Sequence, residues 1–124
     1  MAVNVQHTLP PEALEIVMYT RTMPCPFVSL AKRVFAEYHI PYREVFIDQD
    51  KQAELHVLEW TGFLSVPTII LARTGEDLPY SLPTAIVPNS SPRGINRFTM
   101  ITEPDEIQLI EWVKQAGLMP SAHI

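Results

Sequence analysis

Apolar residues recur along residues 26–38 in steps of three and four, which is the pattern of an amphipathic helix. Lys32, Arg33 and Glu37 fall on the opposite side of that helix. Pro26 suits the first helical position, where no backbone N–H is needed, and Pro41 disfavours helical geometry just before it. We therefore expect a helix that ends near residue 39 and turns these apolar positions inward: Phe27, Leu30, Ala31, Val34, Phe35 and Tyr38.

Three runs rich in apolar and β-branched residues predict strands, over residues 14–19, 42–48 and 66–72. A second helix is expected between the last two of these runs, capped by Asp48 or Asp50 and continuing to about Trp60. Gly62 stands where a left-handed C-cap would end that helix. The resulting order β-α-β-α-β indicates crossover connections and an α/β sheet.

Residues 79–100 contain four prolines, at positions 79, 83, 88 and 92, and this density excludes a helix. We expect residues 79–94 to form a surface insertion that frames the functional groove, has little packing of its own and is not needed for folding. Residues 95–101 could supply a fourth, edge strand. Whether the partner of the third strand precedes or follows the proline-rich part stays open.

The last helix is predicted from the stretch Thr102 to Asp105, read as a capping box with a proline in the first turn. It is expected to pass through Ile107, Ile110, Val113 and Lys114 to Gly117. The predicted organisation is a flexible arm over residues 1–13, one domain over residues 14–118 and a tail over residues 119–124.

Composition narrows the class of protein. With 124 residues, 47% of them hydrophobic, the chain fits one globular domain. A net charge of −5, from 9 basic and 14 acidic residues, argues against a nucleic-acid surface. The N-terminus does not resemble a secretion signal, the apolar runs are too short to span a bilayer, and one cysteine cannot form an internal disulfide. A cytoplasmic protein without membrane or nucleic-acid partners is expected.

Cys25, the only cysteine, falls at the junction of the first predicted strand and the first predicted helix. Unpaired N–H groups and the positive end of the helix dipole favour a thiolate at such a position. The alternative interpretation is a small apolar residue without chemistry, which is the commoner role of a single cysteine. The pair Cys25-Pro26 and the later segment Val66-Pro67-Thr68, which can close over the thiol, favour the reactive interpretation.

These motifs together resemble a glutaredoxin of the thioredoxin superfamily. The resemblance covers residues 14–72 and the last helix, and it implies a thioredoxin-like fold: a central mixed four-stranded sheet in the order β-α-β-α-β-β-α, flanked by three helices. It implies that Cys25 is the nucleophile and that Pro67 is a cis-proline facing it. The backbone of Val66 would bind the substrate, and Arg21 or Thr22 would help to bind a carboxylate of glutathione; Pro26 and Phe27 complete the implied site.

The chain departs from the family pattern in three places. Val28 replaces the second, resolving cysteine, which excludes a purely dithiol mechanism. Pro24 lengthens the loop before the nucleophile, and the glycine pair and aspartate that hold the γ-glutamyl end of glutathione are absent. The stretch Glu103 to Glu106 is instead similar to small redoxins that act with ribonucleotide reductase or mycothiol.

The function predicted from these residues is monothiol thiol-disulfide exchange, in which Cys25 reacts with mixed disulfides of proteins and a low-molecular-weight thiol. The protein would act as a monomer or weak dimer, with glutathione or another small thiol as co-substrate and no required cofactor. One alternative is an iron–sulfur carrier holding a [2Fe–2S] cluster. The other is a thioredoxin-fold binding module with a vestigial cysteine. The four histidines show no zinc-binding spacing, so no metal site is predicted.

Overall fold

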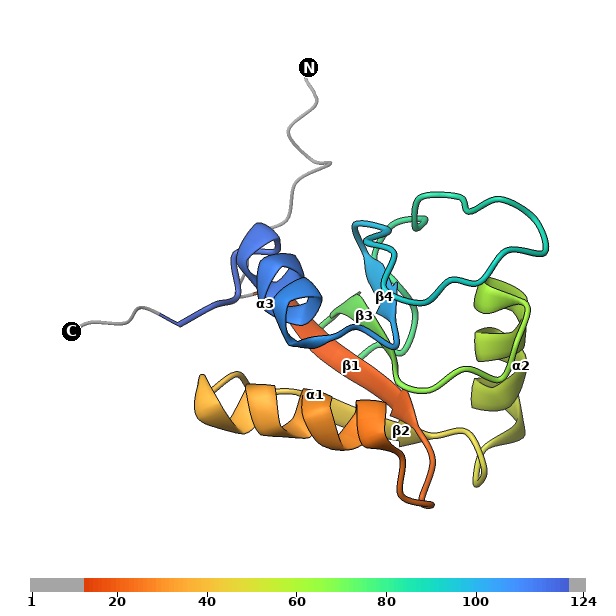
Figure 1. Cartoon of the computed structure of the whole chain (residues 1–124), viewed down its shortest axis with the longest axis horizontal. Coiled ribbons are helices and arrows are strands. Elements are labelled where there is room, and N and C mark those ends of the chain that lie inside the picture. The colour runs from red at the N-terminus through yellow and green to blue at the C-terminus, as the bar shows by residue number, and fades with distance from the viewer. Residues whose placement is uncertain (1–12, 121–124) are drawn as a thin grey trace.

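The computed structural model describes residues 13–120, which contain one four-stranded sheet in the order β2-β1-β3-β4 (Figure 1). The strands are β1 (Leu14–Thr20), β2 (Arg43–Phe46), β3 (Thr68–Arg73) and β4 (Met100–Thr102). β1 pairs in parallel with β2 and antiparallel with β3, and β3 pairs antiparallel with β4. The mixed sheet and the order of its elements confirm the predicted thioredoxin-like fold.

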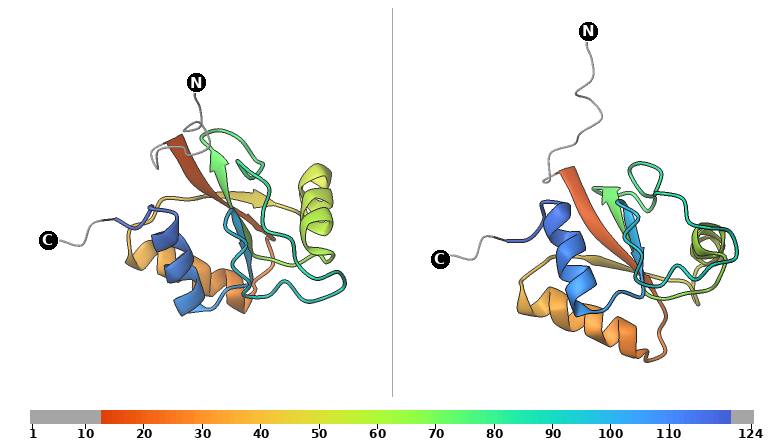
Figure 2. Two further views of the ribbon diagram at one scale, coloured as in Figure 1. Left: turned by 90° about the horizontal axis from the view of Figure 1, so that it is seen from above. Right: turned by 45° about the horizontal axis from the view of Figure 1, so that its top comes forward.

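Three helices cover the sheet: α1 (Pro26–Glu37), α2 (Lys51–Thr61) and α3 (Glu106–Gln115). The views in Figure 2 show α1 and α3 side by side on one face of the sheet, whereas α2 lies on the opposite side. β1 and β3 are the two central strands of the sheet, and most of their residues are buried. Because helices cover both faces of the sheet, these central strands need few polar residues, and this explains the apolar runs from which they were predicted.

The helix α1 begins at the predicted residue, but its inward face is shifted from the expected one. Val28 is buried together with Ala31, Val34 and Phe35, whereas Tyr38 lies beyond the helix and is exposed. The prediction that Tyr38 packs on the core is therefore wrong, because the helix has already ended when the chain reaches it.

The helix α3 passes through the four residues predicted for it, and the structure shows which of its side chains face inward. Leu109, Trp112 and Val113 are its buried residues, while Ile107 is 73% exposed. The capping box is formed by Asp105 and Gln108, each side chain bonding the other residue's backbone N–H, and not by the stretch that starts at Thr102. Thr102 belongs to β4, where its hydroxyl group bonds that of Thr68.

The helix α2 confirms one of the two caps that its sequence allowed. Asp50 is the N-cap, and its carboxylate accepts hydrogen bonds from the N–H groups of Gln52 and Ala53. Gly62 ends the helix with a φ of 80°, in the left-handed region that glycine adopts without steric cost.

The proline-rich segment, residues 79–94, lies between β3 and β4 and answers the open question about the partner of β3. The strand that pairs with β3 is β4, which follows the segment. The first residues of the segment also bind β3: Pro79 forms a bridge with Ala72, and Tyr80 N–H donates to the carbonyl of Leu71. The fourth strand is shorter and lies later than the predicted residues 95–101.

The first part of the proline-rich segment packs against the core, which contradicts the expectation that it has little packing of its own. The ring of Tyr80 is partly buried against the core, and the carbonyl of Ser81 accepts a hydrogen bond from Thr99. Buried Arg97 donates to the carbonyls of Thr84 and Trp60. The segment is therefore tied both to the sheet edge and to the end of α2.

No helix within residues 13–120 is long and apolar enough to cross a membrane. The predicted N-terminal arm, apart from residue 13, and the last four residues of the predicted tail lie outside the described residues.

Candidate active site

Cys25 occupies the N-cap of α1, between the end of β1 and Pro26. Its backbone is extended, with φ of −149° and ψ of 129°, and its carbonyl accepts the first helical hydrogen bond from Ser29 N–H at 2.9 Å. The thiol makes no capping bond to the helix, unlike a serine or aspartate cap. The side chain is thus partly exposed and left free for chemistry at the helix N-terminus.

Opposite the thiol lies the turn that enters β3. The Val66–Pro67 peptide bond is cis, and the carbonyl oxygen of Val66 lies 3.8 Å from the sulfur of Cys25. Pro67 is held by its own carbonyl, which accepts a hydrogen bond of 2.8 Å from Glu103 N–H. Within residues 13–120, the N–H of Val66 has no hydrogen-bond partner, so it is available to an extended ligand.

A groove of about 400 Å³ opens beside Cys25. Three parts of the chain form it: the loop before α1, the turn before β3, and the end of the proline-rich segment together with the residue after β4. Its lining residues are Arg21, Cys25, Phe63, Leu64, Ser65, Val66, Ser91, Pro92, Arg93 and Glu103.

Arg21 and Thr22, the two residues proposed for a carboxylate contact, are separated by the structure. Arg21 lines the groove and donates from Nη2 to the carbonyl of Leu64 at 2.6 Å. Thr22 binds Asp48 instead, through its hydroxyl group and its N–H. The hydroxyl group of Thr22 lowers the pKa of Asp48, and the nearby charge of Arg21 acts in the same direction.

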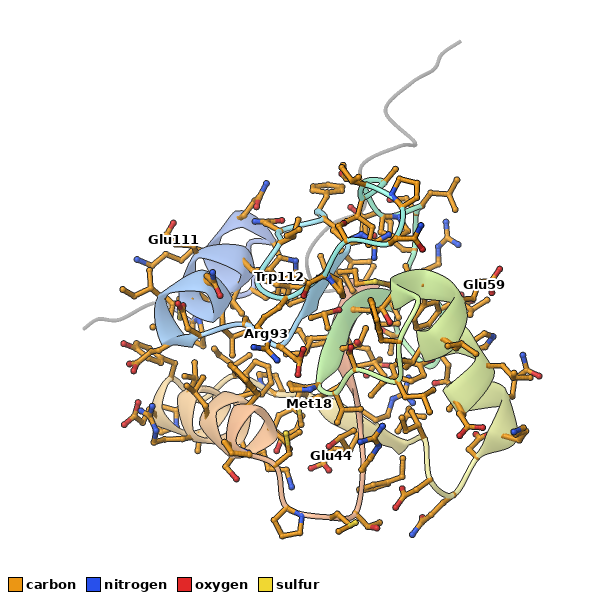
Figure 3. All side chains as sticks on the ribbon, turned by 45° about the vertical axis from the view of Figure 1, so that its right-hand side comes forward. Met18, Glu44, Glu59, Arg93, Glu111 and Trp112 are labelled. Carbon is orange, nitrogen blue, oxygen red and sulfur yellow. The ribbon has the colours of Figure 1, made fainter. Side chains whose placement is uncertain are left out.

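Arg93 comes from the proline-rich segment and reaches across to α1. Its guanidinium carbon lies 5.0 Å from the centre of the Phe27 ring, and its Nε donates to the Glu103 carboxylate at 3.3 Å. Figure 3 labels Arg93 between α1 and the strands. Its backbone is fixed by the parallel bridge between Arg93 and Thr102, so the segment ends beside β4.

The structure gathers three of the seven predicted site residues, Arg21, Cys25 and Val66, directly in the groove. Phe27 does not line the groove but contacts Arg93, which does. Pro26 is the first residue of α1, and Pro67 forms the cis peptide bond with Val66 in the turn opposite Cys25. Sequence reasoning missed Arg93 and Glu103 as groove residues. The only signal for Arg93 was its place at the end of a segment expected to frame the groove.

Comparison with protein families gives a match to the glutaredoxin model over residues 16–74, slightly less than half of the chain. No curated protein matched the chain. Two solved structures are similar to this chain. The first is a buckwheat glutaredoxin–glutathione complex, which shares 16% identity with a TM-score of 0.48 and covers 89% of this chain and 86% of its own. A wheat glutaredoxin shares 18% identity with a TM-score of 0.47, over 84% and 76%.

The matched segment runs from β1 to just past β3 and so includes the helix start at Cys25 and the turn at Pro67. Over these residues the chain is similar to the glutaredoxin family, and the sheet order agrees with a thioredoxin-like fold.

Replacing Val28 with cysteine is expected to create a dithiol that forms an internal disulfide. Val28 is the third residue of α1 and is three positions beyond Cys25, so the two side chains share one face of the first turn. Thiol titration after mild oxidation should find no free thiol, whereas Ala36→Cys, near the other end of the same helix, should keep two. Two free thiols in oxidised Val28→Cys would contradict the geometry of the helix start.

Proposed function

We propose that the protein is a monothiol thiol-disulfide oxidoreductase that exchanges mixed disulfides between proteins and a small thiol such as glutathione. The observation that carries this proposal is the position of the Cys25 thiol. It sits at a helix N-terminus, opens into a groove, and faces the carbonyl of Val66, whose N–H has no hydrogen-bond partner within residues 13–120. The nucleophile in disulfide exchange is a cysteine sulfur that the disulfide can reach, and the groove gives this sulfur such access.

The reaction proceeds in two exchanges that conserve electrons. The Cys25 thiolate attacks the small-thiol sulfur of a mixed disulfide, forming a new disulfide with that small thiol and releasing the protein thiolate, which takes up a proton. A second small thiol, as its thiolate, attacks the same small-thiol sulfur. It regenerates the Cys25 thiolate and leaves as the oxidised dimer of the small thiol.

Val66 has a defined part in this reaction. Its free N–H can pair with the backbone of a peptide-like thiol and align that thiol's sulfur with Cys25.

Val28, at the position of a resolving cysteine, cannot attack the intermediate, so release depends on a second small thiol. The side chains of Phe63 and Leu64, both about half exposed, give the groove an apolar edge.

The test uses the full chain and a cysteine-containing peptide linked by a disulfide to glutathione, cysteine or 2-mercaptoethanol. Turnover should be measured from peptide thiol release, with the same small thiol as reductant. Mass spectrometry should detect Cys25 joined to the small thiol during turnover. Release no faster than without protein, for every disulfide tested, would refute the proposed function.

A further inference from the structure

Two hollows lie between the C-terminal end of α2 and the proline-rich segment, which passes beside this end of the helix (Figure 1). The smaller hollow measures about 200 Å³ and the larger about 520 Å³. Phe63 lines both the groove of Cys25 and the smaller hollow, and Glu59 and Trp60 line both hollows. The groove and the two hollows are therefore contiguous.

The two hollows expose large apolar side chains. Leu82, which lines the larger hollow, is 92% exposed, and Val87, which lines the smaller one, is 72% exposed. Leu78 of the larger hollow and Phe63 of the smaller one are about half exposed. Exposed apolar side chains that gather around hollows are typical of interaction sites.

The wall that the proline-rich segment gives to these hollows is anchored to α2. Buried Arg97 donates hydrogen bonds to the carbonyls of Trp60 and Thr84. Thr84 lies between Pro83, which lines the larger hollow, and Ile86, which lines the smaller one. The anchor is thus placed where the two linings meet, and the prolines restrict the backbone around it. A wall held in this way loses little conformational entropy when a ligand binds.

Glu59 supplies a negative charge at the boundary of the two hollows, and Figure 3 labels it on α2. Glu59 is exposed, and within residues 13–120 its carboxylate has no hydrogen-bond or ion-pair partner. Lys51 of the same helix pairs with Glu54 instead. The chemistry that complements this surface is a positive charge flanked by apolar groups.

We propose that the two hollows bind the polypeptide of the protein whose mixed disulfide reacts at Cys25. A polypeptide is the occupant because the hollows continue the groove in which that disulfide reacts. An extended segment crosses Phe63, places apolar side chains in the hollows and pairs a lysine or arginine with Glu59. The inference rests on the proposed function and names its class of protein substrate, in which a basic residue flanked by apolar residues lies near the modified cysteine.

The test compares peptides in which glutathione forms a mixed disulfide with a cysteine. One is a tripeptide, and two longer peptides add about eight residues, with leucines on both sides of one lysine, either before or after the cysteine. Such an addition extends about 26 Å as a strand. With the unsubstituted protein, kcat/KM for the better long peptide should exceed that for the tripeptide on the order of tenfold, because the hollows bury its leucines.

Three substitutions in the hollows should lower this long-to-short ratio. Leu82→Ser and Val87→Ser should each lower it roughly threefold, since each removes an apolar contact. Glu59→Lys should lower it by at least as much, because the lysine of the peptide then meets a like charge. A long peptide with glutamate in place of its lysine should instead gain from Glu59→Lys. Turnover of the tripeptide should stay unchanged, because none of these residues lines the groove of Cys25.

Ile107→Ser and Glu111→Lys are the matched controls. Ile107 is 73% exposed, Glu111 is exposed, and both belong to α3, on the opposite side of the sheet from α2. Neither substitution should change the long-to-short ratio. An unchanged ratio in Leu82→Ser and Glu59→Lys would overturn the inference. An equal fall for long and short peptides would also overturn it, because the substitutions would then act on the groove itself.

Binding without chemistry separates this inference from the proposed function. Fluorescence anisotropy on Cys25→Ser should show binding of the better long peptide, made with serine in place of its cysteine, and weaker binding when Leu82→Ser is added. If that result is obtained but the unsubstituted protein turns over no mixed disulfide, the proposed function fails and the docking surface stands. Turnover with equal kcat/KM for long and short peptides would leave the proposed function standing and overturn the inference.

Sedimentation of the unsubstituted protein tests the other occupant of such a surface, a second copy of this chain. The protein should sediment as a monomer in which the hollows are open to a substrate. A dimer that Leu82→Ser dissociates would overturn the inference, because the second copy would then cover the hollows.

Discussion

Cys25→Ser is expected to reduce mixed-disulfide turnover to the rate without protein, a loss of roughly a thousandfold or more. Cys25 is the only cysteine of the chain, and Val28 occupies the place where a second thiol would stand. A serine hydroxyl group is not ionised near neutral pH and does not attack a disulfide. The measurement is release of peptide thiol under saturating glutathione.

The substitution should leave folding almost unchanged, which makes the loss interpretable. The Cys25 side chain is partly exposed, and among residues 13–120 its one hydrogen-bond contact is the 3.8 Å approach to the carbonyl of Val66. The free energy of unfolding should therefore change by less than about 1 kcal/mol. Full turnover by a folded Cys25→Ser protein would show that another group reacts with the substrate.

The sequence predicted best those parts of the fold that are decided by local pattern. Pro26 at the start of α1 and Gly62 at the end of α2 lie at the positions expected from backbone geometry alone. The buried strands β1 and β3 were visible as apolar runs for a related reason, because a strand covered on both faces needs few polar residues.

The sequence predicted the extent of α3 but did not define its buried face, because it contains two overlapping apolar stripes. Ile107, Ile110 and Val113 have helical spacing, and so do Leu109, Trp112 and Val113. Periodicity cannot rank these stripes, since each would bury a continuous face. The packing of α3 against α1 and the sheet selects the second stripe, in which Trp112 is 1% exposed and donates from its indole to the carbonyl of Phe98.

The groove was only partly predictable because its walls meet through long-range contacts. Cys25 and Val66 were found from two local motifs, each with its own proline. Arg93 and Glu103 come together because the chain returns from the proline-rich segment and runs beside β4. Residues 79–94 have no helical or strand periodicity that would have indicated this return.

Arg97 presents a different case, a buried cation whose described hydrogen bonds all end on neutral acceptors. It is 6% exposed and donates from Nη1 to the carbonyl of Trp60 at 2.8 Å and from Nε to that of Thr84 at 2.7 Å. Trp60 lies in the last turn of α2, where the helix leaves its carbonyls unpaired and its dipole negative. Burial lowers the pKa of Arg97, but an arginine stays charged throughout the physiological range.

Arg97→Met is therefore expected to destabilise the protein by about 2–4 kcal/mol and to lower the midpoint of thermal unfolding by on the order of 10 °C. Methionine fills a similar volume but donates no hydrogen bond, so the carbonyls of Trp60 and Thr84 lose their partner inside the protein. Arg73→Met is the matched control, because Arg73 is an exposed arginine at the end of β3. Its midpoint should change by no more than a few degrees.

The same experiment decides whether the proline-rich segment is part of the folding unit. Val87, 72% exposed within that segment, should tolerate replacement by serine with almost no change in the midpoint. If Arg97→Met unfolds at the temperature of the Val87→Ser and Arg73→Met proteins, the segment is not anchored through Arg97. A large shift confined to Arg97→Met would instead show that this arginine joins the segment to the end of α2, and that the wall carrying Arg93 is held in place by the core.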